Sequence, residues 1–223
     1  MKTKDAIAVL LSLPKTIYFN IKYLPLSQAL KLPIWLHYST KVKSCYRGVK
    51  CNFSVKPFVI RIGFHTVGCT NPHDRTILSV KKGGKLTFLG SAHIGRWSKI
   101  IVNGNGCLTL GDNFAISAST DIVCYKNITF GRDIQFSWDC LVMDSDTHTI
   151  LDEQMNKSNE NRAVVFGNKI WIGCRCTVMK GTTIPDNCVI GACSFVSGNK
   201  FQAKTVIAGH PAKSIKAIGG WHI

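Results

Sequence analysis

The sequence contains no Cys-x-x-Cys pair, although it has ten cysteines. Metal sites and redox-active dithiols built on that spacing are therefore not indicated. The apolar run at residues 6–13 is too short to cross a bilayer. No small-residue cleavage site follows it, which argues against a secretory signal peptide. We therefore expect the cysteines to be buried free thiols in a protein of the reducing cytoplasm.

Proline is also scarce, with 7 residues, whereas glycine reaches 19 and Ile, Val, Phe and Thr are common. With 45% hydrophobic and 18% charged residues among 223, the chain has the composition of a folded globular protein. Residues that favour strands, combined with glycine, predict many short strands joined by tight corners.

Acidic side chains are few, with 12 Asp and Glu against 28 Lys and Arg, and the net charge is +16. A nucleic-acid binder is one interpretation of this excess. However, the aromatic residues lack the spacing of a base-stacking motif, and residues 101–150 are acidic, with six Asp against Lys126 and Arg132. A basic face toward an anionic membrane or a phosphate-rich ligand explains the charge equally well, so we predict no nucleic-acid partner.

The N-terminal segment combines apolar and basic residues at helical spacing. The apolar positions are Ile7, Leu10, Leu11, Ile17 and Ile21, and the lysines between them are Lys4, Lys15 and Lys22. This pattern fits an amphipathic helix that lies on a membrane surface. It fits equally well a helix that caps the end of a stack of strands.

A six-residue repeat organises most of the chain. From residue 166 the sequence divides into FGNKIW, IGCRCT, VMKGTT, IPDNCV, IGACSF and VSGNKF. Each hexad begins with an apolar residue, and most continue with a small or turn-forming one. The same period places apolar residues at the lead positions upstream: Phe88, Ile94, Leu110, Ile116, Ile122, Phe130, Phe136 and Val142.

Each hexad reads as one short strand and a corner, with the lead residue pointing inward. A single turn cannot bury its apolar face, so the turns must stack. The repeat therefore predicts an all-β fold, a parallel β-helix with three strands per coil. We expect an N-terminal segment at 1–50, the β-helix at 51–212 with a protruding loop at 149–163, and a C-terminal helix or tail at 213–223.

The repeat breaks where a hexad should start at His148. An unpaired imidazole is costly to bury in an inward position, and the polar stretch that follows lacks the period until Val165. Loops that interrupt a regular fold often carry function. His148 is flanked by Asp144 and Asp146, and a carboxylate beside a histidine holds one tautomer as a base near neutral pH.

Three segments resemble the hexapeptide-repeat acyltransferases, in particular the polysaccharide, maltose and galactoside O-acetyltransferases. They are FGRDIQFSWDCLVMDSDTH from Phe130, FGNKIWIGCRCTVMKGTTIPDNCVIGACSFVSG from Phe166, and VIAGHPAKSIK from Val206. The resemblance implies a left-handed β-helix, a homotrimer and active sites between subunits. It also implies acetyl-CoA as co-substrate, no metal, and transfer of the acetyl group to a sugar hydroxyl on a cell-surface polysaccharide or its precursor.

The resemblance assigns roles to individual residues. His148 matches the catalytic base, with Asp144 or Asp146 orienting the ring. The wall of the acceptor site would comprise Ser137, Trp138 and Asp139. The acetyl-CoA site would comprise Trp171, Gly173, Cys174 and Ala192 around the pantetheine, and Lys213 and Lys216 at the phosphates.

Other functions remain open at this point. Transfer to an amine of an amino sugar, or to serine, would leave the donor site looking alike. A zinc-dependent carbonic anhydrase on the same scaffold would need several converging histidines, whereas His93 and His148 lie far apart in the repeat. A basic, non-enzymatic scaffold would need neither His148 nor the basic C-terminus. The basic N-terminus favours a cytoplasmic enzyme with a peripheral contact at the inner membrane face.

Overall fold

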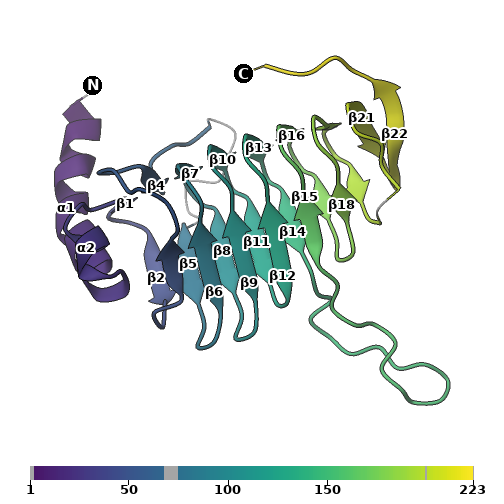
Figure 1. Cartoon of the computed structure of the whole chain (residues 1–223), viewed down its shortest axis with the longest axis horizontal. Coiled ribbons are helices and arrows are strands. Elements are labelled where there is room, and N and C mark those ends of the chain that lie inside the picture. The colour runs from purple at the N-terminus through teal and green to yellow at the C-terminus, as the bar shows by residue number, and fades with distance from the viewer. Residues whose placement is uncertain (1–2, 68–74, 199, 223) are drawn as a thin grey trace.

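The computed structural model describes residues 3–67, 75–198 and 200–222. Helices α1 (Thr3–Tyr23) and α2 (Leu26–Ala29) precede a long stack of coils built from short strands (Figure 1). The strands wind around three sheets, and each strand pairs in parallel with the strand of the next coil, up to the final hairpin. The predicted parallel β-helix with three strands per coil is confirmed.

The sheets are named A, B and C in the order in which each coil visits them. Sheet A has nine strands: β1 (Ile34–Leu36), β4 (Ile60–Ile62), β7 (Ala92–Ile94), β10 (Phe114–Ala118), β13 (Ile134–Trp138), β16 (Ile170–Ile172), β19 (Val189–Ile190), β21 (Thr205–Gly209) and β22 (Ala212–Ala217). Sheet B has seven: β2 (Lys41–Ser44), β5 (Ile77–Val80), β8 (Lys99–Val102), β11 (Asp121–Cys124), β14 (Leu141–Met143), β17 (Thr177–Val178) and β20 (Phe195–Val196). Sheet C has six: β3 (Val49–Cys51), β6 (Lys85–Phe88), β9 (Cys107–Leu110), β12 (Asn127–Phe130), β15 (Val164–Phe166) and β18 (Thr183–Ile184).

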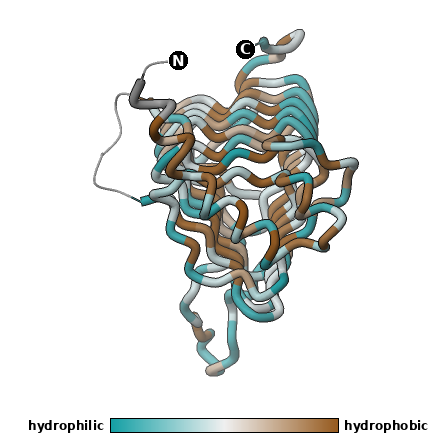
Figure 2. The backbone as a smooth tube through the Cα atoms, turned by 90° about the vertical axis from the view of Figure 1, so that its left-hand side faces the viewer, coloured by the Kyte–Doolittle hydropathy of each residue, from teal (hydrophilic) through white to brown (hydrophobic). Residues whose placement is uncertain are grey.

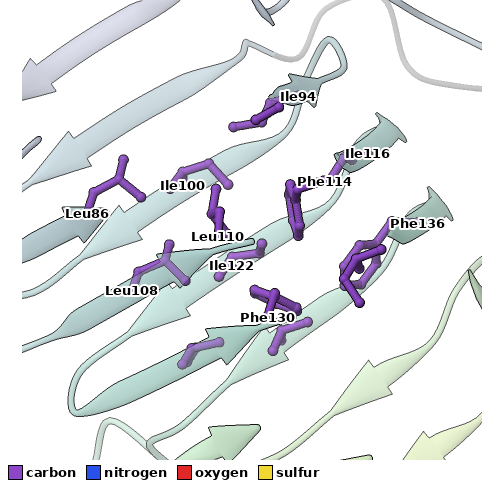
Figure 3. Close-up of a cluster of buried hydrophobic side chains, with 14 of the residues drawn as sticks. Leu86, Ile94, Ile100, Leu108, Leu110, Phe114, Ile116, Ile122, Phe130 and Phe136 are labelled. Carbon is purple, nitrogen blue, oxygen red and sulfur yellow. The ribbon is translucent and has the colours of Figure 1, made fainter. Parts of the chain in front are cut away.

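The core runs along the axis of the stack. Every lead residue of the hexads identified in the sequence is buried, and these residues stack in register from coil to coil. Phe130 lies opposite Phe166, and Phe136 lies opposite Ile172. Figure 3 shows the same arrangement in the middle coils, where Leu, Ile and Phe side chains from all three sheets fill the interior. This burial is what drives the coils to stack.

The corners differ from the expectation that the second hexad residue makes the turn. The left-handed backbone conformation falls instead on the fourth residue, with φ of 56° at Lys169, 58° at Arg175 and 59° at Cys193. The second-position glycines are required by close packing between coils. A Cβ on Gly173, for example, would lie 2.6 Å from the amide nitrogen of Ala192.

The strands begin at Ile34, ahead of the expected position 51, so the first coil comprises β1 to β3. The predicted N-terminal helix is confirmed, and α1 lies across the open end of the stack (Figure 1). Its polar side chains face β1. Asn20 Nδ2 donates to Ile34 O at 2.6 Å, and Thr16 Oγ1 accepts from Leu36 N at 3.1 Å. The helix therefore caps this edge of sheet A.

At the other end, β21 and β22 form an antiparallel hairpin. Lys213 and Lys216 consequently lie on a strand, and the C-terminal segment is a strand and tail without the helix offered as one alternative. Beyond β22 the tail runs back along the stack (Figure 1). Between β14 and β15 a long loop, residues 144–163, projects from the stack where the repeat was predicted to break.

The nine cysteines among the described residues are free thiols, and six of them are buried. Cys107 and Cys174 are half-buried and Cys193 is exposed, so burial applies to only part of the set. Cys69 lies outside the described residues. No helix in the described part of the chain is long and apolar enough to span a membrane.

Candidate active site

The projecting loop starts from a buried carboxylate. Asp144 is fully buried directly after β14. Its oxygens accept hydrogen bonds from three consecutive backbone amides of the preceding coil, those of Tyr125, Lys126 and Asn127, at 2.7–2.8 Å. These bonds fasten the base of the loop to sheets B and C, and they leave the Asp144 carboxylate directed into the stack.

The second carboxylate, Asp146, fastens the loop at a different point. Its Oδ2 lies 2.5 Å from Nζ of Lys180 and accepts a hydrogen bond from Nδ2 of Asn159 at 2.8 Å. The Lys180 ammonium and then the Asn159 amide lower the pKa of Asp146, so the carboxylate is charged near neutral pH. Asp146 therefore ties the beginning of the loop to its end and to the next coil.

Asn159 joins these parts to the backbone of His148. Its Nδ2 also donates to the carbonyl oxygen of His148 at 2.8 Å, and its Oδ1 accepts from the amide of Ile150 at 2.7 Å. Asn159 is only 9% exposed, although it belongs to a polar loop. A single amide side chain thus sets the path of the chain on both sides of His148.

His148 itself is exposed at the base of the loop. Neither Asp144 nor Asp146 hydrogen-bonds its imidazole within the described chain, which differs from the expectation that one of them orients the ring directly. Asp144 is committed to backbone amides and Asp146 to Lys180 and Asn159. Both carboxylates anchor the loop that carries His148.

The outer part of the loop is ordered and carries an apolar tip. Oδ1 of Asp152 accepts hydrogen bonds from the amides of Gln154 and Asn156 at 3.0 and 2.8 Å. Beside this turn, Ile150, Leu151 and Met155 are 56%, 46% and 73% exposed. Such a group of apolar side chains on a projecting, ordered loop is suited to contact another surface.

Another part of the candidate site lies on the outer face of sheet A. Trp171 on β16 is 41% exposed, and its Nε1 donates to Oγ of Ser137 on β13 at 3.2 Å. On its other side, the ring of Trp221 from the C-terminal tail lies 6.5 Å from it between centroids. Trp221 is fixed by a hydrogen bond from its Nε1 to Lys169 O at 2.9 Å, beside a pocket of about 350 Å³.

Trp138 and Asp139 follow Ser137 at the corner between sheets A and B. The carbonyl oxygen of Trp138 accepts from the amide of Arg175 at 2.9 Å. The Asp139 carboxylate lies 3.9 Å from Nε of Arg175 in an exposed ion pair. The sequence-predicted acceptor residues are thus contiguous with Trp171, and Arg175 joins them.

The residues predicted to contact pantetheine lie at the next corners along the stack. The Gly173 amide already donates to Ile190 O at 2.8 Å, so it is committed to pairing between coils. Within the described chain, the amides of Cys174 and Ala192 have no hydrogen-bond partner. Of the amides predicted near the thioester arm, these two remain available to a ligand.

Lys213 and Lys216 are exposed on β22. Lys216 is connected to Trp171 across sheet A by pairs of neighbouring strands. Trp171 is paired with Val189, Val189 with Val206, and Val206 with Lys216. Three strand spacings separate the two ends, or about 14 Å. This face of the stack therefore offers an aromatic ring at one end and ammonium groups at the other.

The structure does not bring His148 together with Trp171 in one chain. Trp171 lies on sheet A, whereas the loop that carries His148 leaves sheet B after β14 and enters sheet C at β15. Within one chain, the two residues therefore belong to different faces of the stack. The described residues contain no group of three or more His, Cys, Asp or Glu arranged to hold a metal ion.

Three residues of this region were not identified from the sequence: Asn159, Lys180 and Trp221. Asn159 lies in a stretch of similar polar residues. Lys180 is the third residue of a regular hexad, a position to which the repeat gives no special role. Trp221 lies beyond the last hexad, where no repeat predicts its position. Their contacts depend on how the loop and the tail fold back onto the stack.

No protein-family model matches the sequence, but individual relatives and solved structures do. The chain is 30% identical over 146 residues to the putative lipopolysaccharide biosynthesis O-acetyl transferase WbbJ of Escherichia coli K12, covering 61% of this chain and 74% of that protein. It is 30% identical over 162 residues to a probable acetyltransferase of Mycobacterium tuberculosis, covering 66% of this chain and about half, 52%, of that protein.

Among solved structures, the chain is similar to the polysialic acid-specific acetyltransferase NeuO, with a TM-score of 0.55 and 22% identity over 83% of both chains. This likeness establishes the shared fold, the left-handed parallel β-helix that the family resemblance implied. From its sequence and its fold, the chain belongs to the hexapeptide-repeat acyltransferase family, in the group that contains the polysaccharide and galactoside O-acetyltransferases.

Proposed function

We propose that this protein transfers the acetyl group of acetyl-CoA to a hydroxyl group of a sugar, in a cell-surface polysaccharide or its precursor. The observation that carries the proposal is His148, exposed at the break in the β-helix and held there through its backbone by Asn159 and Asp146. A histidine in this position serves as a general base near neutral pH.

In the proposed reaction, a neutral nitrogen of the His148 imidazole takes the proton of the acceptor hydroxyl. The oxygen then attacks the carbonyl carbon of the thioester and forms a C–O bond. The tetrahedral intermediate collapses with cleavage of the C–S bond, and the imidazolium returns its proton to the departing thiolate. The products are an acetyl ester and free CoA, and the histidine returns to its neutral state.

The donor would lie along the outer face of sheet A. Trp171, supported by Ser137 and Trp221, would pack against the pantetheine arm. The available amides of Cys174 and Ala192 would donate to its carbonyl groups, and Gly173 would keep the corner close-packed. Lys213 and Lys216 would meet the phosphates of CoA.

We infer that the enzyme is a homotrimer with each site between two subunits. The separation of His148 from Trp171 within one chain supports this assembly. The apolar loop tip at Ile150, Leu151 and Met155 supplies a surface that a neighbouring subunit would cover. Ser137, Trp138 and Asp139 would then form the acceptor-side wall opposite the histidine.

The acceptor class rests on the relatives, which include proteins described as lipopolysaccharide and polysialic acid O-acetyltransferases. We place the enzyme in the cytoplasm, with a peripheral contact at the inner membrane face. The basic N-terminal region supports this location, since residues 1–50 carry nine Lys or Arg and only Asp5 as an acid.

The proposal is tested by incubating the protein with isotopically labelled acetyl-CoA and a panel of glycans that includes amino sugars. The masses of the products are then measured by mass spectrometry. We expect acetylated glycan whose label is released by mild alkali, as from an ester. An alkali-stable product would be an amide and would assign an N-acetyltransferase. CoA release without any acetylated glycan would contradict transfer to sugar.

A further inference from the structure

An ordinary surface helix buries its apolar face, whereas helix α1 buries a row of polar side chains. Its polar residues Ser12, Thr16 and Asn20, spaced four apart on one face, are completely buried against β1. Each replaces a missing strand partner. Ser12 Oγ accepts from Tyr38 N at 2.9 Å, and Asn20 bonds both the amide and the carbonyl of Ile34. The edge of sheet A is satisfied by side chains.

Since the polar face points inward, the apolar face is left outside. The exposed fractions of its large side chains range from 43% to 65%. They belong to Ile7, Leu10, Leu11, Ile17, Tyr18 and Ile21. These positions share one side of the helix, opposite Thr16. Figure 2 looks onto this end of the stack and shows α1 across it with a largely hydrophobic sequence. An amphipathic helix that exposes its apolar stripe is suited to lie in a membrane surface.

The flank of the same helix is basic. An open pocket of about 770 Å³ lies where Lys15 of α1 meets the first corners between sheets A and B, and it also presents Lys41, Arg75 and Arg96. None of the described residues that line it is acidic. Lys15 Nζ donates to Tyr38 O and Thr40 O at 2.6 Å, so helix and pocket are fixed together.

His37 holds Arg96 in place within this pocket. Its Nε2 lies 2.9 Å from Nη2 of Arg96, and Nε of Arg96 donates to Gly63 O at 3.2 Å. The ring accepts from the guanidinium and adds no charge of its own, so the positive charge stays on Arg96. Two of the five guanidinium N–H groups are used, and the remaining three have no partner among the described residues, so they could bind an anion.

We propose that this end of the β-helix docks on an anionic lipid bilayer, with the stripe of α1 in the interface and the basic pocket around the phosphate of a lipid headgroup. This assignment rests on the membrane contact of the proposed function and names its ligand. A second copy of the chain is the poorer occupant. It would oppose Lys15, Lys22 and Arg75 with the same cations, whereas an anionic surface complements them.

The test is flotation of the full-length protein with vesicles of phosphatidylcholine alone, or of equal parts phosphatidylcholine and phosphatidylglycerol. We expect binding only to the anionic vesicles. The double variant K41Q/R75Q should lower the partition coefficient about 30-fold, since each cation near such a surface contributes a factor of about 5. The matched variant K81Q/K82Q removes two exposed lysines from another corner and should bind nearly as wild type does.

The stripe is tested separately. L10S/I21S should lower binding at least about tenfold, whereas L89S/I215S, which removes two exposed apolar residues elsewhere, should not. If a control variant lost as much vesicle binding as its matched test variant, binding would depend on overall charge or hydrophobicity. That result would overturn the assignment. Inorganic diphosphate that binds the pocket without any vesicle binding would instead assign a soluble phosphate ligand. Concentration-dependent dimers lost in L10S/I21S, again without vesicle binding, would assign a second copy.

The experiment does not depend on acetyl transfer. His148→Ala should float with anionic vesicles as the wild type does, because His148 lies in the loop between β14 and β15 and outside the docking surface. A negative acetylation assay would therefore not contradict membrane docking, and a lack of vesicle binding would not contradict acetyl transfer.

Discussion

Nδ2 of Asn159 donates to the carbonyl oxygen of His148 at 2.8 Å, and this is the contact that fixes the histidine backbone. The same nitrogen donates to Asp146, and Oδ1 accepts from the amide of Ile150. The loop is long and polar, yet its functional end is pinned by one nearly buried side chain. The position of the proposed base is therefore set by a residue eleven positions further along the chain.

Replacing this residue should lower catalysis without unfolding the stack. We expect Asn159→Ala to reduce kcat at least about tenfold and to leave the KM for acetyl-CoA near its original value, because it removes hydrogen bonds worth about 1 kcal/mol each from the loop. Steady-state kinetics and circular dichroism measure both effects. Asn156→Ala, at the exposed turn, is the control and should retain activity.

Trp171 should affect the donor. Trp171→Ala should raise the KM for acetyl-CoA about tenfold and change kcat less, since it removes contact area from the proposed pantetheine face. Trp171→Phe keeps most of that area and loses only the hydrogen bond to Ser137. A KM unchanged in Trp171→Ala would place the donor elsewhere.

The stability of the N-terminal coil should depend on pH through His37. Burial, and then Arg96 and Lys15, lower the pKa of His37 to about 4, below the ordinary value of 6.5. The unfolded chain therefore takes up this proton at a higher pH than the folded chain. The contribution of His37 to the free energy of unfolding should be fully present above pH 6.5. It should decline between pH 6.5 and about 4, by up to about 3 kcal/mol.

Urea unfolding at a series of pH values measures this contribution. His37→Gln does not titrate in this range, so its curve should lack that part of the acid destabilisation. If the wild type and His37→Gln lose stability in parallel, the imidazole is not held neutral in the fold.

The cap on sheet A should be essential to stability. Asn20→Ala leaves the buried amide and carbonyl of Ile34 without partners, so we expect a loss of about 2–4 kcal/mol in the free energy of unfolding. Denaturant titration checks it. Asn52→Ala changes an exposed side chain at another corner and should cost little. A small loss in Asn20→Ala would mean that water satisfies this edge.

Much of the fold follows from the sequence because it is repetitive. Phe166, Ile172 and Val178 recur at a period of six, and burial of a lead residue needs only that period. The corners were assigned to the wrong hexad position, because Gly173 is conspicuous whereas Arg175, in the left-handed conformation, has no residue type that signals it. The orientation of helix α1 could not be predicted either, because the spacing of apolar residues such as Ile7 and Leu10 does not indicate which face packs against the stack.

The site was predictable only in part. His148 stands out in the sequence because a continued repeat would place it in an inward position. Trp171 lies next to Ser137 because both occupy sheet A in neighbouring coils. Asn159, Lys180 and Trp221 could not be placed, since their contacts arise from the folding of irregular segments. The flanking carboxylates were expected to orient the imidazole, but Asp144 binds amides of the preceding coil, which its proximity to His148 in the sequence did not reveal.

The central claim is that the exposed imidazole at the break in the stack is the general base. The most direct test compares His148→Ala with the wild-type protein for acetyl transfer to glycan and for binding of CoA. We predict a kcat at least about 100-fold lower with CoA affinity and folding unchanged. Retention of most of the activity in His148→Ala would contradict the account.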